Sequence, residues 1–355
     1  MKPFLTLTTS AAVALLISLG TGGSAIAQNS ERSIPARMIP APAAASPELR
    51  ESIMGSPDPD IAGNNAFGPT SDQEWKAFVK QSDGAASQSV DAMAQAFGVE
   101  FAHHVVDGVN IYQVTPNEIN PAHEDHRFLF VHGGAYVIGG GEAGLLEAFL
   151  IASRAKIKVI SIDYRMPPDH PFPAAVEDVV TIYRHVLENR PAKAIALGGT
   201  SAGGGLTLAS IHRFHELGLE TPGAIYAGTP WADLTTASDS LHTNAGLDRI
   251  LVSSDGLLKA AAELYAAGED LTHHLISPVY GDFSNFPPAY LVTGTRDMLL
   301  SDTVRVHRKL RANGNIADLN VYEGFSHADY LLAPTSPESQ EVYAELDKFL
   351  LIHLD

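Results

Sequence analysis

From Phe128 to its end, the sequence alternates between short strand-like runs and longer helix-like stretches. The strand-like runs are Phe128–Val131, Val159–Ile162, Ala194–Leu197, Ala224–Ala227, Tyr290–Thr293 and Leu319–Tyr322. The helix-like stretches are Leu145–Ser153, Ala174–Asn189, Ala202–Leu217, Asp302–Ala312 and Glu338–Leu351. Strands that alternate with helices in this way predict an α/β fold, in which helices cover both faces of a mostly parallel sheet.

Two further strand-like runs, Phe101–Val106 and Val109–Val114, precede this region and are separated by Asp107-Gly108. Asp and Gly tolerate the positive φ angles of a type I′ turn, so the pair predicts a tight hairpin. The hairpin adds an antiparallel edge, which makes the expected sheet eight-stranded.

One long segment interrupts the alternation. Between Trp231 and Ser277 the sequence has a helical stretch, "SSDGLLKAAAELYAAG", and no clear strand. A long insertion at the active-site end of a sheet often forms a lid, so we expect a helical cap here. Two short helices predicted ahead of the sheet, one opened by the capping-box pattern Ser71–Glu74 and one at Ser89–Phe97, are expected to join it.

These patterns divide the chain into six parts. They are a signal peptide (1–27), a Pro/Ala-rich flexible lead-in (28–60), N-terminal cap helices (61–100), the first part of the core (101–230), the cap helices (231–277) and the second part of the core (278–355).

The first residues have the layout of a secretory signal peptide. Lys2 is followed by an apolar run from Ala11 to Leu19 and then by small residues ending in Ala25-Ile26-Ala27. The A-x-A pattern predicts cleavage near Ala27 and export to the periplasm or the medium. The apolar run is too short to span a bilayer, so no stable membrane anchor is expected.

The charge balance narrows the class of partner. The chain of 355 residues carries a formal net charge of −18, which argues against nucleic acid and anionic membranes as partners. It has no cysteine, so no disulfide holds it together, and a chain of this length can bury a core large enough to fold without one.

The stretch "LGGTSAGGGL" places Ser201 in the pattern G-x-S-x-G, formed by Gly199–Gly203. A predicted strand precedes Ser201 and a predicted helix follows it, which is the setting of a nucleophilic serine on a sharp turn. The glycines allow strained backbone angles and close packing. These residues alone leave open the alternative of a plain glycine turn.

A serine nucleophile needs a base, and the base needs an orienting carboxylate. Asp297 follows the run Tyr290–Thr293, and His327 follows Leu319–Tyr322. Both therefore lie at carboxyl ends of strands, the edge at which Ser201 lies. Asp302 is the main rival acid, but it fits better as the N-cap of the next helix.

A reacting carbonyl also needs donors for its oxyanion. His132-Gly133-Gly134 leaves the strand Phe128–Val131, and the two glycines let backbone N–H groups approach a ligand. We expect the amides of Gly133 and Gly134, together with that of Ala202, to form the oxyanion hole. His132 itself is expected to be structural.

Neither metal nor cofactor is expected. The pairs His103-His104 and His273-His274 have no accompanying acidic or cysteine cluster, and adjacent residues on a strand point to opposite faces. The sequence contains neither a phosphate loop nor a dinucleotide fingerprint.

Several ordered motifs together resemble one family, the hormone-sensitive-lipase-like esterases (bacterial family IV) of the α/β-hydrolase fold. The stretches that carry the resemblance are "HGGAY", "YRMPPDHPFPAAVED", "GTSAGG", "TRDMLLSD" and "GFSHADY". The resemblance implies a triad of Ser201, Asp297 and His327 and a mobile cap over the pocket. Thr200, where many members have an acidic residue, resembles the GTSAG branch, while Ala135 and Met298 depart from the family pattern without removing a catalytic atom.

The resulting expectation is a serine carboxylesterase that hydrolyses short- to medium-chain acyl esters, with a small-molecule ester and water as its partners. Tyr136 and Trp231 are expected to line the substrate pocket, and a homodimer is possible. A lactone hydrolase or an acetyl or aryl esterase would use the same machinery. A non-catalytic binding module of the same fold is a more distant alternative.

Overall fold

The computed structural model describes residues 33–355, so the expected signal peptide at 1–27 lies outside the described residues. The chain divides into two units, Met1–Pro40 and Ala41–Asp355. The described part of the first unit, residues 33–40, contains no helix or strand. The second unit holds all the elements considered below.

Twelve α-helices and eight strands are present in the described residues. The strands are β1 (Val99–Val106), β2 (Val109–Pro116), β3 (Arg127–Val131), β4 (Val159–Asp163), β5 (Ile195–Thr200), β6 (Ala224–Gly228), β7 (Ala289–Gly294) and β8 (Ala317–Tyr322). The helices are α1 (Pro47–Met54), α2 (Ile61–Ala66), α3 (Asp72–Ala86), α4 (Val90–Phe97), α5 (Leu145–Ala155), α6 (Ala174–Leu187), α7 (Ala202–Glu216), α8 (Ser240–Thr243), α9 (Leu257–Ala266), α10 (Leu300–Ala312), α11 (Asp329–Leu332) and α12 (Pro337–His353).

The strands form one eight-stranded sheet in the order β1-β2-β4-β3-β5-β6-β7-β8. β1, β2 and β4 pair antiparallel, and every pair from β4 to β8 is parallel. At the β1–β2 turn, Asp107 and Gly108 have φ angles of 48° and 84°, as a type I′ turn requires. The predicted mostly parallel eight-stranded sheet is confirmed.

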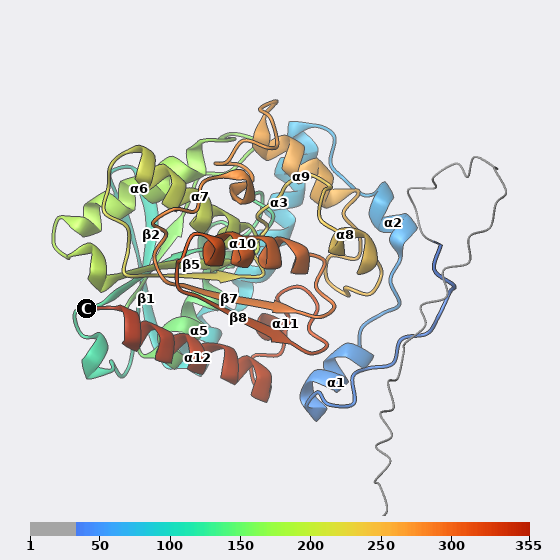
Figure 1. The fold of residues 1–355 in the computed structure, drawn as a ribbon, viewed down its shortest axis with the longest axis horizontal. Helices are drawn as coiled ribbons and strands as arrows, with labels where there is room; N and C mark the ends of the chain where they lie inside the picture. The colour runs from blue at the N-terminus through green and yellow to red at the C-terminus, as the bar shows by residue number, and fades with distance from the viewer. Residues whose placement is uncertain (1–32) are drawn as a thin grey trace, which may run out of the picture. The chain divides into compact units, whose positions relative to one another are not determined.

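Helices cover both faces of this sheet (Figure 1). Side chains alternate between the faces along each strand, so in β3 Leu129 and Val131 point to one core while Phe128 and Phe130 point to the other. The first core is closed by α6, α7 and α10, and the second by α4, α5 and α12.

The residues before the sheet contain more structure than expected. Ser71 caps α3 by accepting a hydrogen bond from the Glu74 amide, in agreement with the capping-box pattern. The range 28–60, expected to be a flexible lead-in, contains α1, whose Leu49 is fully buried in the second core. Ser46 caps α1 and also bonds the Glu338 carboxylate at the start of α12, at 2.7 Å from both its N and its Oγ.

The segment 231–277 contains α8, α9 and long loops, and the structure shows no strand in it. Its start is fixed by Asp302, whose carboxylate accepts hydrogen bonds from the amides of Ala232 and Asp233 at 3.0 and 2.9 Å. The expectation that Asp302 is an N-cap is wrong, because α10 begins earlier and its N-cap is Leu299. Asp302 instead lies in the first turn of α10, where its side chain anchors the segment that leaves β6.

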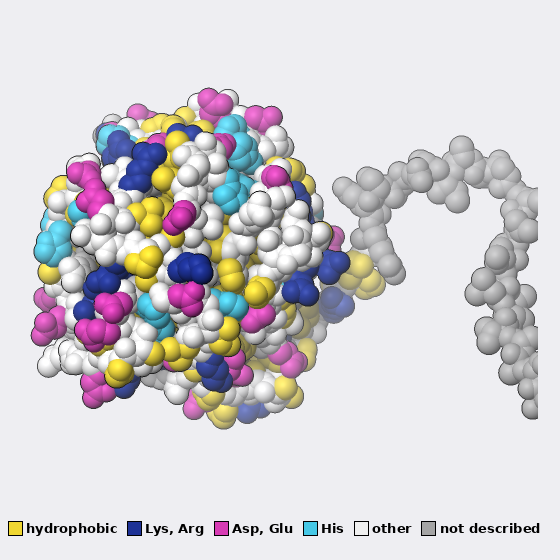
Figure 2. All heavy atoms as spheres, turned by 60° about the vertical axis from the view of Figure 1, so that its left-hand side comes forward, with side chains coloured by type: hydrophobic (Ala, Val, Ile, Leu, Met, Phe, Trp, Pro, Cys, Tyr) yellow, Lys and Arg dark blue, Asp and Glu magenta, His cyan; other side chains and the backbone are white. Residues whose placement is uncertain are grey.

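The surface reflects the acidic composition of the chain, which has 41 Asp and Glu against 23 Lys and Arg. On the face shown in Figure 2, acidic and basic side chains are interspersed. Among residues 33–355, no helix is long and apolar enough to cross a membrane.

Candidate active site

Ser201 lies on the sharp turn between β5 and α7, with φ 63° and ψ −124°. These angles are strained for a residue with a side chain and are typical of a nucleophile elbow. Two glycines make the turn possible. A Cβ on either Gly199 or Gly203 would lie far inside van der Waals contact with the carbonyl oxygen of Val131 on β3. The turn therefore packs directly on the neighbouring strand.

A chain of hydrogen bonds runs from this serine to a buried aspartate. His327 Nε2 lies 2.9 Å from Ser201 Oγ, and His327 Nδ1 lies 3.2 Å from Asp297 Oδ1. His327 follows β8, and Asp297 follows β7. The three side chains that the sequence singled out are thus brought together at one edge of the sheet.

The two buried partners shift each other's pKa. Burial raises the pKa of Asp297, but the hydrogen bond to His327, the charge of its imidazolium and the hydrogen bonds from Thr229 and Leu299 together hold it below its ordinary value. Burial lowers the pKa of His327, but the hydrogen bond and charge of Asp297 outweigh it. The charges of Asp248 and Asp329 act in the same direction, so the pKa of His327 lies above its ordinary 6.5. The two residues therefore stabilise each other's charged forms, the Asp297 carboxylate and the imidazolium that His327 becomes when it accepts a proton.

Two threonines that sequence reasoning missed hold the other oxygen of the aspartate. Thr293 donates a 2.9 Å hydrogen bond to Asp297 Oδ2, and Thr229 donates a second one to the same oxygen. The Leu299 amide donates to Oδ1 at 2.8 Å. Thr229 follows β6 with a φ of 36°, and no local pattern marks it as a partner of a residue 68 positions away.

Of the expected oxyanion donors, Gly133 packs against the elbow and Ala202 follows Ser201 in the chain. Gly133 lies directly against the elbow, since a Cβ there would approach the Thr200 carbonyl at 2.9 Å and the Ser201 Cβ at 3.3 Å. The backbone hydrogen bonds of residues 33–355 outside regular helices and strands do not use the amides of Gly133, Gly134 or Ala202 as donors.

His132 has the packing of a structural residue. It is buried, its ring stacks on Tyr164 with centroids 4.1 Å apart, and Tyr164 donates a 2.9 Å hydrogen bond to its carbonyl. Burial lowers the pKa of the His132 imidazole. The stretch that begins at Tyr164 is held by an ion pair, in which Arg165 lies 2.7 Å from the buried carboxylate of Asp178.

Tyr136 and Trp231, the expected pocket residues, lie near each other with ring centroids 6.1 Å apart. Both are almost fully buried. Tyr136 stacks on Tyr265 of α9 at 4.0 Å, and its hydroxyl lies against Gly205, one turn of α7 beyond the serine. The Trp231 amide donates a 2.9 Å hydrogen bond to the Ser201 carbonyl. The Tyr136 side chain and the Trp231 backbone thus connect the elbow with the cap.

A buried carboxylate lies behind the elbow. Glu147 of α5 accepts hydrogen bonds from Thr200 Oγ1 at 2.6 Å and from the Tyr226 hydroxyl at 2.9 Å. Thr200 also lies 2.7 Å from the Tyr330 hydroxyl. Burial raises the pKa of Glu147 from 4.5 to about 7, against the lowering effect of these hydrogen bonds. Thr200 thus links the elbow to a buried hydrogen-bond network formed by Glu147, Tyr226 and Tyr330.

The part of the chain that the structure describes has no group of three or more His, Cys, Asp or Glu side chains arranged to hold a metal ion. The polar groups around Ser201 are instead those of acyl transfer: a hydroxyl, an imidazole, a carboxylate and unpaired amides.

A serine at a strand–helix turn, followed along the chain by an aspartate and a histidine at later strand ends, is the arrangement of an α/β hydrolase. Residues 128–331, more than half of the chain, match the family described as "alpha/beta hydrolase fold". The chain belongs to this family.

Similar proteins of known structure agree with this assignment. The chain is 47% identical to a protein solved as "an esterase E25", with a TM-score of 0.89 over 92% of this chain and 99% of that one. It is 30% identical to "an esterase from the bacterial hormone-sensitive lipase (HSL) family", with a TM-score of 0.75 over 88% of this chain and 100% of that one. An acetyl-hydrolase of Streptomyces hygroscopicus is 32% identical over 69% of this chain and 82% of its own. The resemblance to hormone-sensitive-lipase-like esterases is confirmed, and the GTSAG branch stays a prediction.

Proposed function

We propose that this protein is a serine carboxylesterase in which Ser201 is the nucleophile, His327 the general base and Asp297 the orienting acid. The observation that carries the proposal is the continuous hydrogen-bond chain from Ser201 Oγ through His327 to Asp297, with unpaired amides beside the serine. Such a chain activates a hydroxyl that is unreactive by itself.

The reaction follows from the positions of these groups. His327 Nε2 takes the proton of Ser201 while Oγ attacks the ester carbonyl, and the amides of Gly133, Gly134 and Ala202 bind the resulting oxyanion. His327 then gives the proton to the departing alcohol, which leaves an acyl-enzyme. Water, deprotonated by the same imidazole, hydrolyses that ester and restores Ser201.

Short- to medium-chain acyl esters are the proposed substrates. The similar protein of Streptomyces hygroscopicus is named an acetyl-hydrolase, and acetyl is the shortest of these acyl groups. In this chain the Tyr136 ring packs against both Tyr265 and Trp231, and its hydroxyl lies against Gly205 of α7, the helix that follows Ser201. A lactone or an acetylated sugar contains the same reacting carbonyl and is the alternative substrate.

The test of the activity is Ser201→Ala with p-nitrophenyl butyrate as substrate. Loss of the nucleophile is expected to lower kcat by about 10⁴-fold or more and to abolish covalent labelling by a fluorophosphonate probe. A variant that hydrolyses the ester at the wild-type rate would rule out Ser201 as the nucleophile. A wild-type protein that is not labelled would instead favour the non-catalytic binding module.

The substrate class is tested with a panel at equal concentrations. It contains p-nitrophenyl esters from acetate to palmitate, an unsubstituted lactone and a peracetylated sugar. The proposal expects kcat/KM to be highest for acetate to octanoate. A lactone that exceeds every ester by tenfold or more would select the alternative.

We also infer export and assembly from separate features. The Lys2, apolar and A-x-A pattern supports export without a membrane anchor, so the protein recovered from the periplasm or medium is expected to begin at Gln28. Protein found in the cytoplasm with Met1 to Ala27 intact would contradict this.

A homodimer is supported by β8, which ends the sheet and pairs on one side only. Light scattering of the purified protein tests this assembly.

A further inference from the structure

One short segment of the cap, residues 244–249, contacts both loops that carry the candidate base and acid. Asn244 Nδ2 donates to the carbonyl of Asp297 at 2.8 Å and to that of Thr295 at 3.4 Å. The Arg249 amide donates to Ser326 Oγ, one residue before His327, at 3.2 Å. The cap therefore supports these loops from the side.

Asp248 is the centre of this segment. Its Oδ2 accepts the Met298 amide at 2.9 Å, from the acid loop, and the His327 amide at 3.3 Å, from the base loop. Its Oδ1 accepts the amides of Ile250 and Leu251 at 2.9 and 3.2 Å. Asp248 is fully buried, so one carboxylate joins three separate parts of the chain away from water.

We propose that Asp248 is a positioning residue of the esterase reaction: from the cap it sets the spacing between the loops of Asp297 and His327, and it adds a second negative charge beside the imidazole. The inference rests on the proposed roles of Ser201, His327 and Asp297. It goes beyond them because it gives the cap a second role. The cap would position the catalytic residues as well as cover the pocket.

The charges around the imidazole support the electrostatic part. Three carboxylates face His327: Asp297 after β7, Asp248 from the cap and Asp329 at the start of α11. Asp329 forms an ion pair with Arg249, which offsets its charge. Burial and the charge of Asp297 raise the pKa of Asp248, whereas the imidazolium of His327 and the hydrogen bonds from backbone N–H groups lower it and so favour its charged form.

The alternative is that Asp248 only closes a local turn. Its bonds to the amides of Ile250 and Leu251 are the ordinary contacts of an aspartate that stabilises the residues following it. That role would affect folding but not the protonation of His327, so the pH dependence of activity separates the two.

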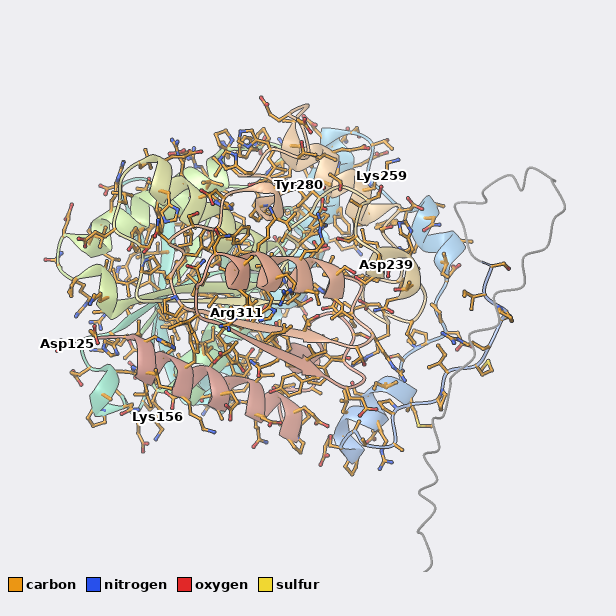
Figure 3. The ribbon with its side chains drawn as sticks, in the orientation of Figure 1. Asp125, Lys156, Asp239, Lys259, Tyr280 and Arg311 are labelled. Carbon is orange, nitrogen blue, oxygen red and sulfur yellow. The ribbon has the colours of Figure 1, made fainter. Side chains whose placement is uncertain are left out.

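The experiment compares Asp248→Asn with Asp239→Asn in the full protein. Asp239 is an exposed residue of the same cap, beside α8, so its substitution removes the same charge without touching either loop (Figure 3). For each variant kcat and kcat/KM for p-nitrophenyl acetate are measured from pH 5 to 10, with the melting temperature as the measure of folding.

Asp248→Asn is expected to lower kcat about tenfold and to move the acid limb of kcat/KM by about one pH unit to lower pH, because the imidazolium loses a neighbouring charge. Asp239→Asn is expected to leave both unchanged. An unchanged kcat, or a lower kcat with an unmoved acid limb, would overturn the proposal and assign Asp248 to folding alone.

Asp248→Glu keeps the charge on a longer side chain and so tests the geometry by itself. We expect kcat to fall at least threefold with the acid limb close to its wild-type position, and a wild-type kcat would contradict the positioning role even if Asp248→Asn does not fold. Ser201→Ala separates the two levels of inference. If Ser201→Ala is inactive and both Asp248 variants behave as wild type, only the role of Asp248 fails, whereas an active Ser201→Ala removes the basis of both.

Discussion

The nucleophile side and the base side of the site are held in different ways. Ser201 is positioned by backbone packing, because Gly199 and Gly203 let the elbow press against the Val131 carbonyl. Asp297 is positioned by hydrogen bonds from the hydroxyls of Thr229 and Thr293, and the His327 amide donates to Asp248 of the cap. Sterics therefore set the place of the serine, whereas polar contacts set the place and the pKa of its partners. Substitutions should act on the two sides in distinguishable ways.

The largest expected effect is on the polar side. Asp297→Asn keeps the size of the side chain but removes the charge that orients and stabilises the imidazolium, so kcat is expected to fall about 10⁴-fold with little change in the melting temperature. Steady-state kinetics with p-nitrophenyl butyrate measure it. A loss of less than tenfold would mean that another acid supplies the charge, and Asp248 would be the first to substitute.

The second prediction concerns the packed side. In Gly199→Ala the added methyl group collides with the β3 backbone, so the elbow must shift and kcat/KM is expected to fall roughly a hundredfold, together with stability. Gly84→Ala is the matched control, because nothing lies within 4 Å of a Cβ at that position in α3. The control should keep full activity and gain about 0.5–1 kcal/mol from helix propensity. Equal behaviour of the two variants would contradict the packing argument.

A smaller effect is expected at Thr229. Thr229→Val removes the hydroxyl that donates to Asp297 Oδ2 and keeps the shape, so kcat should fall about tenfold, the effect of one hydrogen bond to a charged group. Thr229→Ser retains the hydroxyl and should stay near the wild-type rate. If both variants lose activity equally, the shape of the residue at this strained position matters more than its hydrogen bond.

The smallest effect on activity is expected behind the elbow, at Glu147. Its pKa of about 7 in the folded protein, against 4.5 as the ordinary value, means that folding favours the protonated form. The contribution of Glu147 to stability is therefore fully present below about pH 4.5 and is lost as the pH rises to about 7.

Glu147→Gln should remove part of this fall without changing kcat. The difference in unfolding free energy between pH 5 and pH 8, from denaturant titrations, is expected to shrink by about 1–3 kcal/mol. Burial also raises the pKa of Asp302 to about 7, and Asp302 remains in the variant, so some of the fall persists. Glu263→Gln, an exposed substitution on α9, is the control and should leave the difference unchanged.

Much of the fold follows from local patterns in the sequence. The runs that form β3, β5, β6 and β7 are almost entirely buried, and all six runs from Phe128 on alternate with helices, so their apolar character and spacing predict the parallel strands. The strands extend one to three residues beyond the predicted runs, and β5, which was predicted to start at Ala194, begins at Ile195 and reaches Thr200. The added end of β5 is Gly198-Gly199-Thr200, and because glycine has a low preference for strands, pairing with β6 holds these residues extended.

The candidate site was predictable where its residues follow strands. Ser201, Asp297 and His327 each follow a predicted strand, so the topology alone brings them to one edge. Thr229 and Asp248 were not predictable, because their partners lie about 70 and 50 to 80 residues away and neither stands in a recognisable motif. Asp302 shows the converse: an acid in the first turn of a helix looks like a local cap, yet its contacts are long-range.

The contacts of α1 have a practical consequence for recombinant production. Ser46 at its start is bonded to Glu338 of α12, and Ser52 and Ser56 near its end are bonded to Arg249, which pairs with Asp329 two residues after His327. A gene trimmed to begin at the sheet would discard this helix as leader sequence. The trimmed enzyme would lose a support of its base loop, so the first residue chosen for expression can change the measured turnover of an intact catalytic domain.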